Sequence, residues 1–123
     1  MFNGLEHAAI ATPDPERLAQ WYAAHLEFQI VFRYGGNVFV KAKNGSMIEM
    51  IPAQGERAAQ SARSPGLRHL AIAVDDFDAA CERLLAGGVA FFEPPREVDG
   101  MRLVFFDDLD GNILHLIHRR EPI

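Results

Sequence analysis

The sequence is poor in cysteine, with Cys81 as the only one among 123 residues. An intramolecular disulfide and a cysteine-based zinc motif are therefore both excluded. Any metal site has to be built from histidine and carboxylate side chains. Cys81 falls on the apolar face of an expected helix, so we interpret it as a small buried hydrophobic residue rather than a reactive thiol.

Basic residues and long apolar runs are also scarce. The 12 Lys and Arg against 17 Asp and Glu give a net charge of −5, which argues against a nucleic-acid partner. No apolar run approaches the roughly 20 residues of a membrane span, so no membrane partner is expected. The N-terminal segment has neither a basic leader nor the apolar stretch of a secretory signal, which predicts a cytoplasmic protein.

What the sequence does contain is an internal repeat. Residues 5–11 (LEHAAIA) reappear as residues 67–73 (LRHLAIA), with five of seven positions identical at an offset of 62. Residues 45–51 (GSMIEMI) align with residues 111–117 (GNILHLI) at an offset of 66. The two halves therefore represent one unit used twice.

The length suits one compact domain, residues 1–123, built from two modules. We predict module one at about 1–52, a linker at 53–66 that is partly helical, and module two at about 67–123.

Each module is predicted to run strand, helix, strand, strand, strand (βαβββ), which gives an α+β fold class with two sheets and helices on their outer faces. The predicted strands are residues 5–11, 27–34, 37–43 and 46–52, then 67–74, 89–93, 101–107 and 112–118. Asp14 and Pro15 mark the start of the first helix. Asp75 with Asp78 can cap the second helix, and Gly87-Gly88 end it.

Four side chains capable of binding a metal occupy matching positions in the two modules. His7 and His69 lie at the same place in the first strands, and Glu49 and His115 at the same place in the last strands. If an approximate two-fold axis relates the modules, strand alternation allows all four to converge.

These residues could also have a purely structural role in the core. A lone histidine in an apolar strand is more often a satisfied core residue than a ligand. Glu49 is costly to bury unless a cation or a buried arginine accompanies it. A metal is the simpler explanation, since three imidazoles are available with it.

The sequence resembles the vicinal oxygen chelate superfamily, which includes glyoxalase I, methylmalonyl-CoA epimerase, fosfomycin resistance proteins and extradiol dioxygenases. The similar segments are residues 5–11, 21–28, 67–76 and 105–116, the last of which resembles the signature Phe-x-Asp-Pro-Asp-Gly-Asn-x-x-Glu-Leu.

The resemblance implies a cup of curved mixed sheets with helices outside, a divalent metal at its base, a small-molecule substrate and a homodimer. It places His7, Glu49, His69 and His115 at the four ligand positions. His115 stands where the family usually has glutamate, and Leu109 replaces the usual proline.

Three imidazoles and one carboxylate favour a divalent transition metal such as Zn, Ni, Fe or Co. We expect a metal-dependent lyase or isomerase of the glyoxalase type, with Glu49 as the catalytic base and no further cofactor. Arg33 and Arg102 are candidates for holding an anionic substrate. Two alternatives remain, an extradiol-type dioxygenase and a non-catalytic antibiotic-binding resistance protein. The cup can be closed by both modules of one chain or by a dimer partner.

Overall fold

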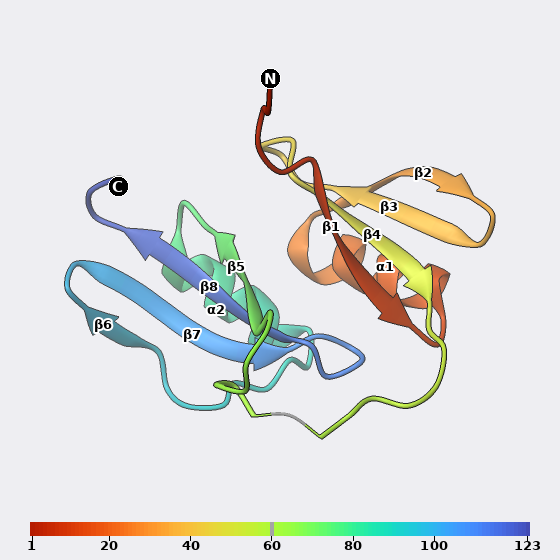
Figure 1. Ribbon diagram of the computed structural model, residues 1–123. Coiled ribbons are helices and arrows are strands. Elements are labelled where there is room, and N and C mark those ends of the chain that lie inside the picture. The colour runs from red at the N-terminus through yellow and green to blue at the C-terminus, as the bar shows by residue number, and fades with distance from the viewer. Residues whose placement is uncertain (60) are drawn as a thin grey trace. The chain divides into compact units, whose positions relative to one another are not determined.

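The computed structural model describes residues 1–59 and 61–123 (Figure 1), so one residue of the predicted linker, Gln60, lies outside the described part. The chain divides into two compact units, Met1–Ala58 and Ala59–Ile123.

The first unit contains one helix and a four-stranded mixed sheet. Its elements are β1 (His7–Thr12), α1 (Pro15–Leu26), β2 (Gln29–Tyr34), β3 (Asn37–Lys41) and β4 (Met47–Pro52). The sheet order is β1-β4-β3-β2, with β1 parallel to β4 and the other neighbours antiparallel. The first and last strands of the module are therefore hydrogen-bonded side by side.

Local sequence signals explain where these elements begin and end. The Asp14 side chain caps α1 by accepting a hydrogen bond from the Arg17 backbone N–H at 3.1 Å. Between β2 and β3, Gly35 and Gly36 both have positive φ angles, 53° and 89°. A two-residue hairpin turn requires that conformation, and glycine adopts it without steric cost.

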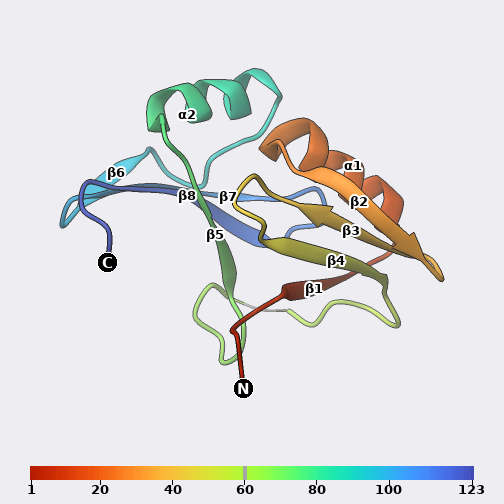
Figure 2. The same cartoon turned by 90° about the horizontal axis from the view of Figure 1, so that it is seen from above.

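The two faces of the first sheet differ in character. Helix α1 packs on one face (Figures 1 and 2), where its buried residues Leu18, Ala19 and Tyr22 meet the apolar side of the sheet. The buried strand residues are Val38, Val40, Ile48 and Met50. Because side chains alternate along a strand, His7, Phe39 and Glu49 lie on the face turned away from the helix.

The second unit has the same order of elements. They are β5 (His69–Ala73), α2 (Phe77–Ala86), β6 (Arg96–Val98), β7 (Met101–Asp107) and β8 (Ile113–Arg119), and the sheet order is β5-β8-β7-β6. Helix α2 buries Phe77, Cys81 and Leu84. The predicted α+β class with two tandem βαβββ modules and mixed sheets is thus confirmed, and Cys81 is buried as expected.

One predicted strand is wrong. Residues 89–93 make only an isolated bridge, between Phe91 and Phe106, and a hydrogen bond from the Phe92 N–H to the Phe105 carbonyl at 3.0 Å. Pro94 and Pro95 follow directly, and proline has no N–H to donate to a ladder. Pairing resumes at Arg96, so β6 lies between the predicted strands at 89–93 and 101–107, where no strand was predicted.

Two smaller predictions also need correction. The cap of α2 is Asp76, whose carboxylate accepts a hydrogen bond from the Ala79 N–H at 3.0 Å, rather than Asp75. The linker forms no helix in its described residues, 53–59 and 61–66, and has a single hydrogen-bonded turn from Ser61 to Ser64. Among the described residues, neither helix has the length and apolar character needed to cross a membrane.

Candidate metal centre

In the first module, β1 and β4 present His7 and Glu49 on the same face of the sheet. The parallel register sets His7 opposite Met47 and Ala9 opposite Glu49. Along β1, His7 is therefore two residues before the position opposite Glu49, so the two side chains are neighbours on the same face of the sheet. The His7 Nε2 and Glu49 Oε1 atoms are 3.4 Å apart.

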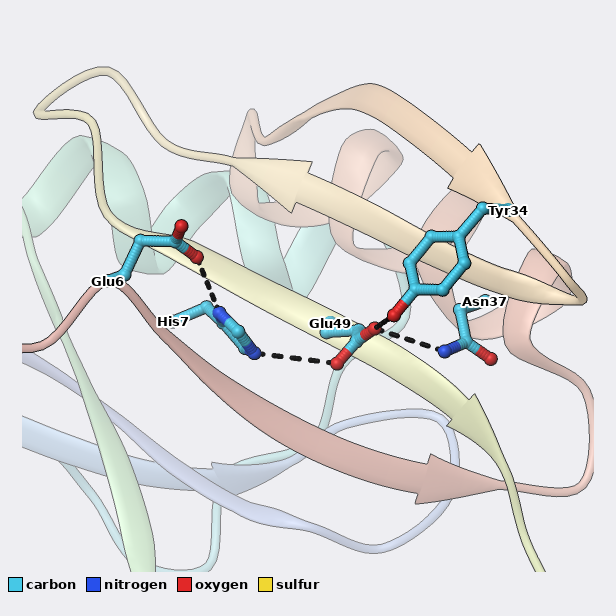
Figure 3. A network of polar contacts seen from close by, with 5 residues as sticks. All are labelled: Glu6, His7, Tyr34, Asn37 and Glu49. Atoms are coloured by element: carbon cyan, nitrogen blue, oxygen red, sulfur yellow. Dashed lines mark hydrogen bonds and ion pairs between the residues drawn. The ribbon is translucent and has the colours of Figure 1, made fainter.

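Glu49 is a buried carboxylate, with only 7% of its surface exposed. Its Oε2 accepts hydrogen bonds from the Tyr34 hydroxyl at 2.8 Å and from the Asn37 amide nitrogen at 3.0 Å (Figure 3). Its Oε1 faces His7. These contacts provide the partners that a buried carboxylate requires, and no arginine is among them.

His7 is oriented by a second carboxylate. The Glu6 Oε1 atom lies 2.6 Å from His7 Nδ1, on the opposite side of the ring from Glu49 (Figure 3). When Nδ1 donates its proton to a carboxylate, the Nε2 lone pair is left for a metal, an arrangement common among metal-binding histidines. His7 also packs edge-on against Phe39, with ring centroids 5.2 Å apart.

In the second module, His69 and His115 are neighbours. Their ring centroids lie 4.7 Å apart with the planes at 62°. His115 Nδ1 lies 3.1 Å from the Leu116 carbonyl, and donation to that oxygen leaves Nε2 as the acceptor. Burial lowers the pKa of His115; the Leu116 hydrogen bond opposes this shift, while the charges of His69 and Arg119 add to it. A lowered pKa keeps the ring neutral, the form that ligates metals.

The two modules place these pairs in the same register. Ala9 is opposite Glu49 in the first sheet, and Ala71 is opposite His115 in the second. The structure thus joins the four predicted residues two by two, each pair within its own module. Among residues 1–59 and 61–123, no three His, Cys, Asp or Glu side chains form a cluster with the arrangement of a metal site.

The residues that surround the pairs were not predicted from the sequence. Phe39 is the β3 partner of Glu49 and Phe105 is the β7 partner of His115, and the two phenylalanines are separated by the same offset of 66 as Glu49 and His115. The repeat offset could therefore have predicted Phe39 and Phe105 from the sequence. Tyr34, Asn37 and Glu6 had no such signal, because their importance depends on side-chain reach.

Three other residues have contacts outside the pairs. Arg33 donates two hydrogen bonds to Glu16 of α1, at 2.6 and 2.9 Å, and Arg102 donates one to Asp78 of α2 at 2.8 Å. Both candidate anion-binding arginines are therefore engaged by helix carboxylates. His118 Nδ1 lies 3.0 Å from the Val74 carbonyl, in agreement with its opposite strand parity.

A hollow of about 520 Å³ opens at the β2–β3 turn and the start of α1, but neither His7 nor Glu49 lines it. We therefore do not assign it as the substrate site.

Comparison with known proteins gives a consistent result for the whole chain. The model of the Glyoxalase/Bleomycin resistance protein/Dioxygenase superfamily matches residues 4–116. No curated protein matches the chain significantly.

Solved structures share the fold over nearly their full lengths. A glyoxylase/bleomycin resistance protein/dioxygenase domain from Frankia sp. EAN1pec has a TM-score of 0.81 at 24% identity, covering 100% of this chain and 96% of its own. Oxidase ChaP-H2 has a TM-score of 0.77 at 26% identity, covering 97% and 95%. Lactoylglutathione lyase from Agrobacterium tumefaciens has a TM-score of 0.71 at 19% identity, covering 93% and 92%.

Proposed function

Because the chain belongs to the Glyoxalase/Bleomycin resistance protein/Dioxygenase superfamily, we propose that it is a metal-dependent lyase or isomerase of the glyoxalase type. Its substrate is a small oxygen-rich molecule, and its reaction is proton transfer next to a carbonyl. The ligands of the metal are His7, Glu49, His69 and His115, one pair from each module, within one chain or across a homodimer. We propose a cytoplasmic location.

The observation that carries this proposal is the geometry of His7 and Glu49. Two ligands at Zn–N and Zn–O bond lengths and a tetrahedral angle lie about 3.3 to 3.5 Å apart. The 3.4 Å between His7 Nε2 and Glu49 Oε1 fits that spacing. A protonated imidazole paired with the carboxylate would have a similar separation, so metal binding has to be tested directly.

The donor set also fits a transition metal. Imidazole nitrogen is a good ligand for Zn, Ni, Fe and Co, and a single carboxylate adds an oxygen donor. Glu6 and the Leu116 carbonyl contact Nδ1 of His7 and His115, and donation from Nδ1 leaves each Nε2 as an acceptor. When bound, the metal supplies Lewis-acid polarisation of a substrate oxygen.

Glu49 is the group we assign to proton transfer. Its Oε2 is held by Tyr34 and Asn37, while Oε1 faces His7 Nε2 at 3.4 Å. When it is not bound to a metal, that oxygen would receive a proton from the carbon beside a substrate carbonyl and return it to the neighbouring carbon. The Phe39 ring packs edge-on against His7 beside this carboxylate.

An extradiol-type dioxygenase is the second candidate, because the family description includes dioxygenases and a structure that is 26% identical is named an oxidase. Iron in such enzymes uses two histidines and one carboxylate and keeps its other positions open for substrate and oxygen. His115 adds a third imidazole at one of those positions, which weighs against this chemistry. A resistance protein that only sequesters an antibiotic has no need of the paired ligands.

Deuterium exchange into lactoylglutathione in D₂O tests the proposal. Metal-loaded protein should exchange the proton on the carbon next to the thioester carbonyl, as detected by NMR. Glu49→Gln should abolish exchange. If this variant still binds metal, Glu49 acts as the base. If it has lost the metal, Glu49 is chiefly a ligand. Absence of exchange, together with oxygen consumption on a catechol, would favour the dioxygenase instead.

A further inference from the structure

We propose that Tyr34 and Asn37 are positioning residues that hold Oε2 of Glu49 and leave Oε1 as the only oxygen available to a metal. The inference rests on the proposed function and deepens it. Both contacts end on the same carboxylate oxygen, from the Tyr34 hydroxyl at 2.8 Å and the Asn37 amide at 3.0 Å (Figure 3). The oxygen facing His7 has neither donor.

The hairpin between β2 and β3 brings the two donors together. Tyr34 is the last residue of β2, Asn37 is the first of β3, and the register pairs them directly across the Gly35-Gly36 turn. A turn of two residues leaves little freedom between its ends. The Tyr34 ring is also stacked on Phe39, with centroids 6.2 Å apart and the planes at 26°. The donors therefore approach Glu49 as one preorganised unit.

The second module shows that this pair is not a general feature of the fold. At the offset of 66, Asn37 corresponds to Leu103, whose cross-strand partner on the hairpin is Arg96 rather than a tyrosine. The last-strand residue there is His115, which binds the Leu116 carbonyl instead. The hydroxyl and amide donors thus occur in the module that has a carboxylate and are replaced in the module that has an imidazole.

The consequence is a choice of binding mode. A free carboxylate can bind a metal through one oxygen or two. Two hydrogen bonds to Oε2 compete with the second mode and fix the direction of Oε1. A purely structural role, in which Tyr34 and Asn37 only satisfy a buried acceptor, would affect folding stability without changing how the metal is bound.

The test compares wild type with Tyr34→Phe, Asn37→Ala and the double variant. Tyr34→Phe removes the hydroxyl alone and keeps the ring against Phe39. Arg33→Gln is the matched control, because it removes hydrogen bonds to another carboxylate, Glu16, from the same hairpin. Zinc affinity is measured by competition with a chromogenic chelator, and the number of oxygen ligands by X-ray absorption of the zinc-loaded proteins. Circular dichroism confirms folding.

We expect each single variant to bind zinc about 10-fold more weakly, and the double variant up to about 100-fold. The double variant should also gain an oxygen ligand as Glu49 turns to bind through both oxygens, while Arg33→Gln matches wild type. Wild-type affinity and an unchanged oxygen count in folded Tyr34→Phe and the double variant would overturn this proposal alone. A wild type that binds no zinc would overturn the proposed function and this inference with it.

Discussion

Glu49 and His115 occupy the same position in the two modules, each opposite an alanine of the first strand and beside a phenylalanine of the third. The register pairs Glu49 with Ala9 and Phe39, and His115 with Ala71 and Phe105. One architectural position therefore carries a carboxylate in one module and an imidazole in the other.

Removing an imidazole of either pair should remove metal. His7→Ala and His115→Ala are expected to lose more than the roughly 10- to 100-fold in affinity that the loss of an outer partner costs. His118→Ala is the matched control, because His118 lies three residues after His115 on the same strand, has the opposite strand parity and contacts the Val74 carbonyl. Competition titration with a chelator measures all three. Equal losses for His7→Ala and His118→Ala would contradict the assignment.

Glu6 should support His7 without binding metal itself. Glu6→Gln weakens the charge-assisted contact at 2.6 Å and lets the imidazole turn, so metal affinity should fall by about 10-fold. The control is Glu56→Gln, which makes the same change at an exposed position of the linker. Calorimetric titration with zinc measures both. An affinity unchanged by Glu6→Gln would mean that the contact does not orient the ring.

The stability of the metal-free protein should depend on pH through His115. Burial lowers its pKa below the ordinary 6.5, so the unfolded chain takes up the proton at a higher pH than the folded chain. The stability contributed by the neutral ring is present above about pH 6.5 and is lost as the pH falls toward the folded pKa. Each unit of pKa difference corresponds to about 1.4 kcal/mol.

Urea unfolding in the presence of a chelator, between about pH 7.5 and pH 5.5, measures this effect. The His115→Gln variant should lose less stability than wild type as the pH falls, because it has no proton to take up at that position. Parallel curves for the two proteins would contradict a lowered pKa.

His115→Glu should change the choice of metal. A second carboxylate makes the donor set harder, so affinity for Mn²⁺ and Mg²⁺ should rise relative to Zn²⁺. Without metal, the buried carboxylate lacks the donors that Tyr34 and Asn37 give Glu49, so the metal-free variant should be less stable than wild type by about 1 to 3 kcal/mol. Metal competition assays and thermal unfolding measure the two effects. An unchanged preference for zinc would argue against His115 as a ligand.

The repeat made most of the fold predictable from the sequence. Similar segments at offsets of 62 and 66 predicted the strand order, and Asp14 with Pro15 marked the start of α1 correctly. The repeat offset rises by four residues between α2 and β8. In this region Pro94-Pro95 follows the apolar run at 89–93, and β6 forms after the two prolines. An apolar run predicts burial, but backbone hydrogen bonding decides whether it becomes a strand.

Strand parity predicted the face that His7 and Glu49 share, because alternation depends on the backbone alone. It could not predict Tyr34, Asn37 or Glu6. Tyr34 reaches Glu49 across the width of β3 with a long side chain, and Glu6 lies before β1 where no periodicity applies. Contacts of this kind depend on rotamers and on the exact turn geometry.

Metal content shows whether His7, Glu49, His69 and His115 form a metal site in the protein. The protein should be purified without added metal, analysed by inductively coupled plasma mass spectrometry, and unfolded thermally with and without chelator. We expect a stoichiometric transition metal and a lower melting temperature after chelation, because a ligand bound only to the folded state stabilises it. Absence of stoichiometric metal, with a melting temperature unchanged by chelator, would contradict this assignment.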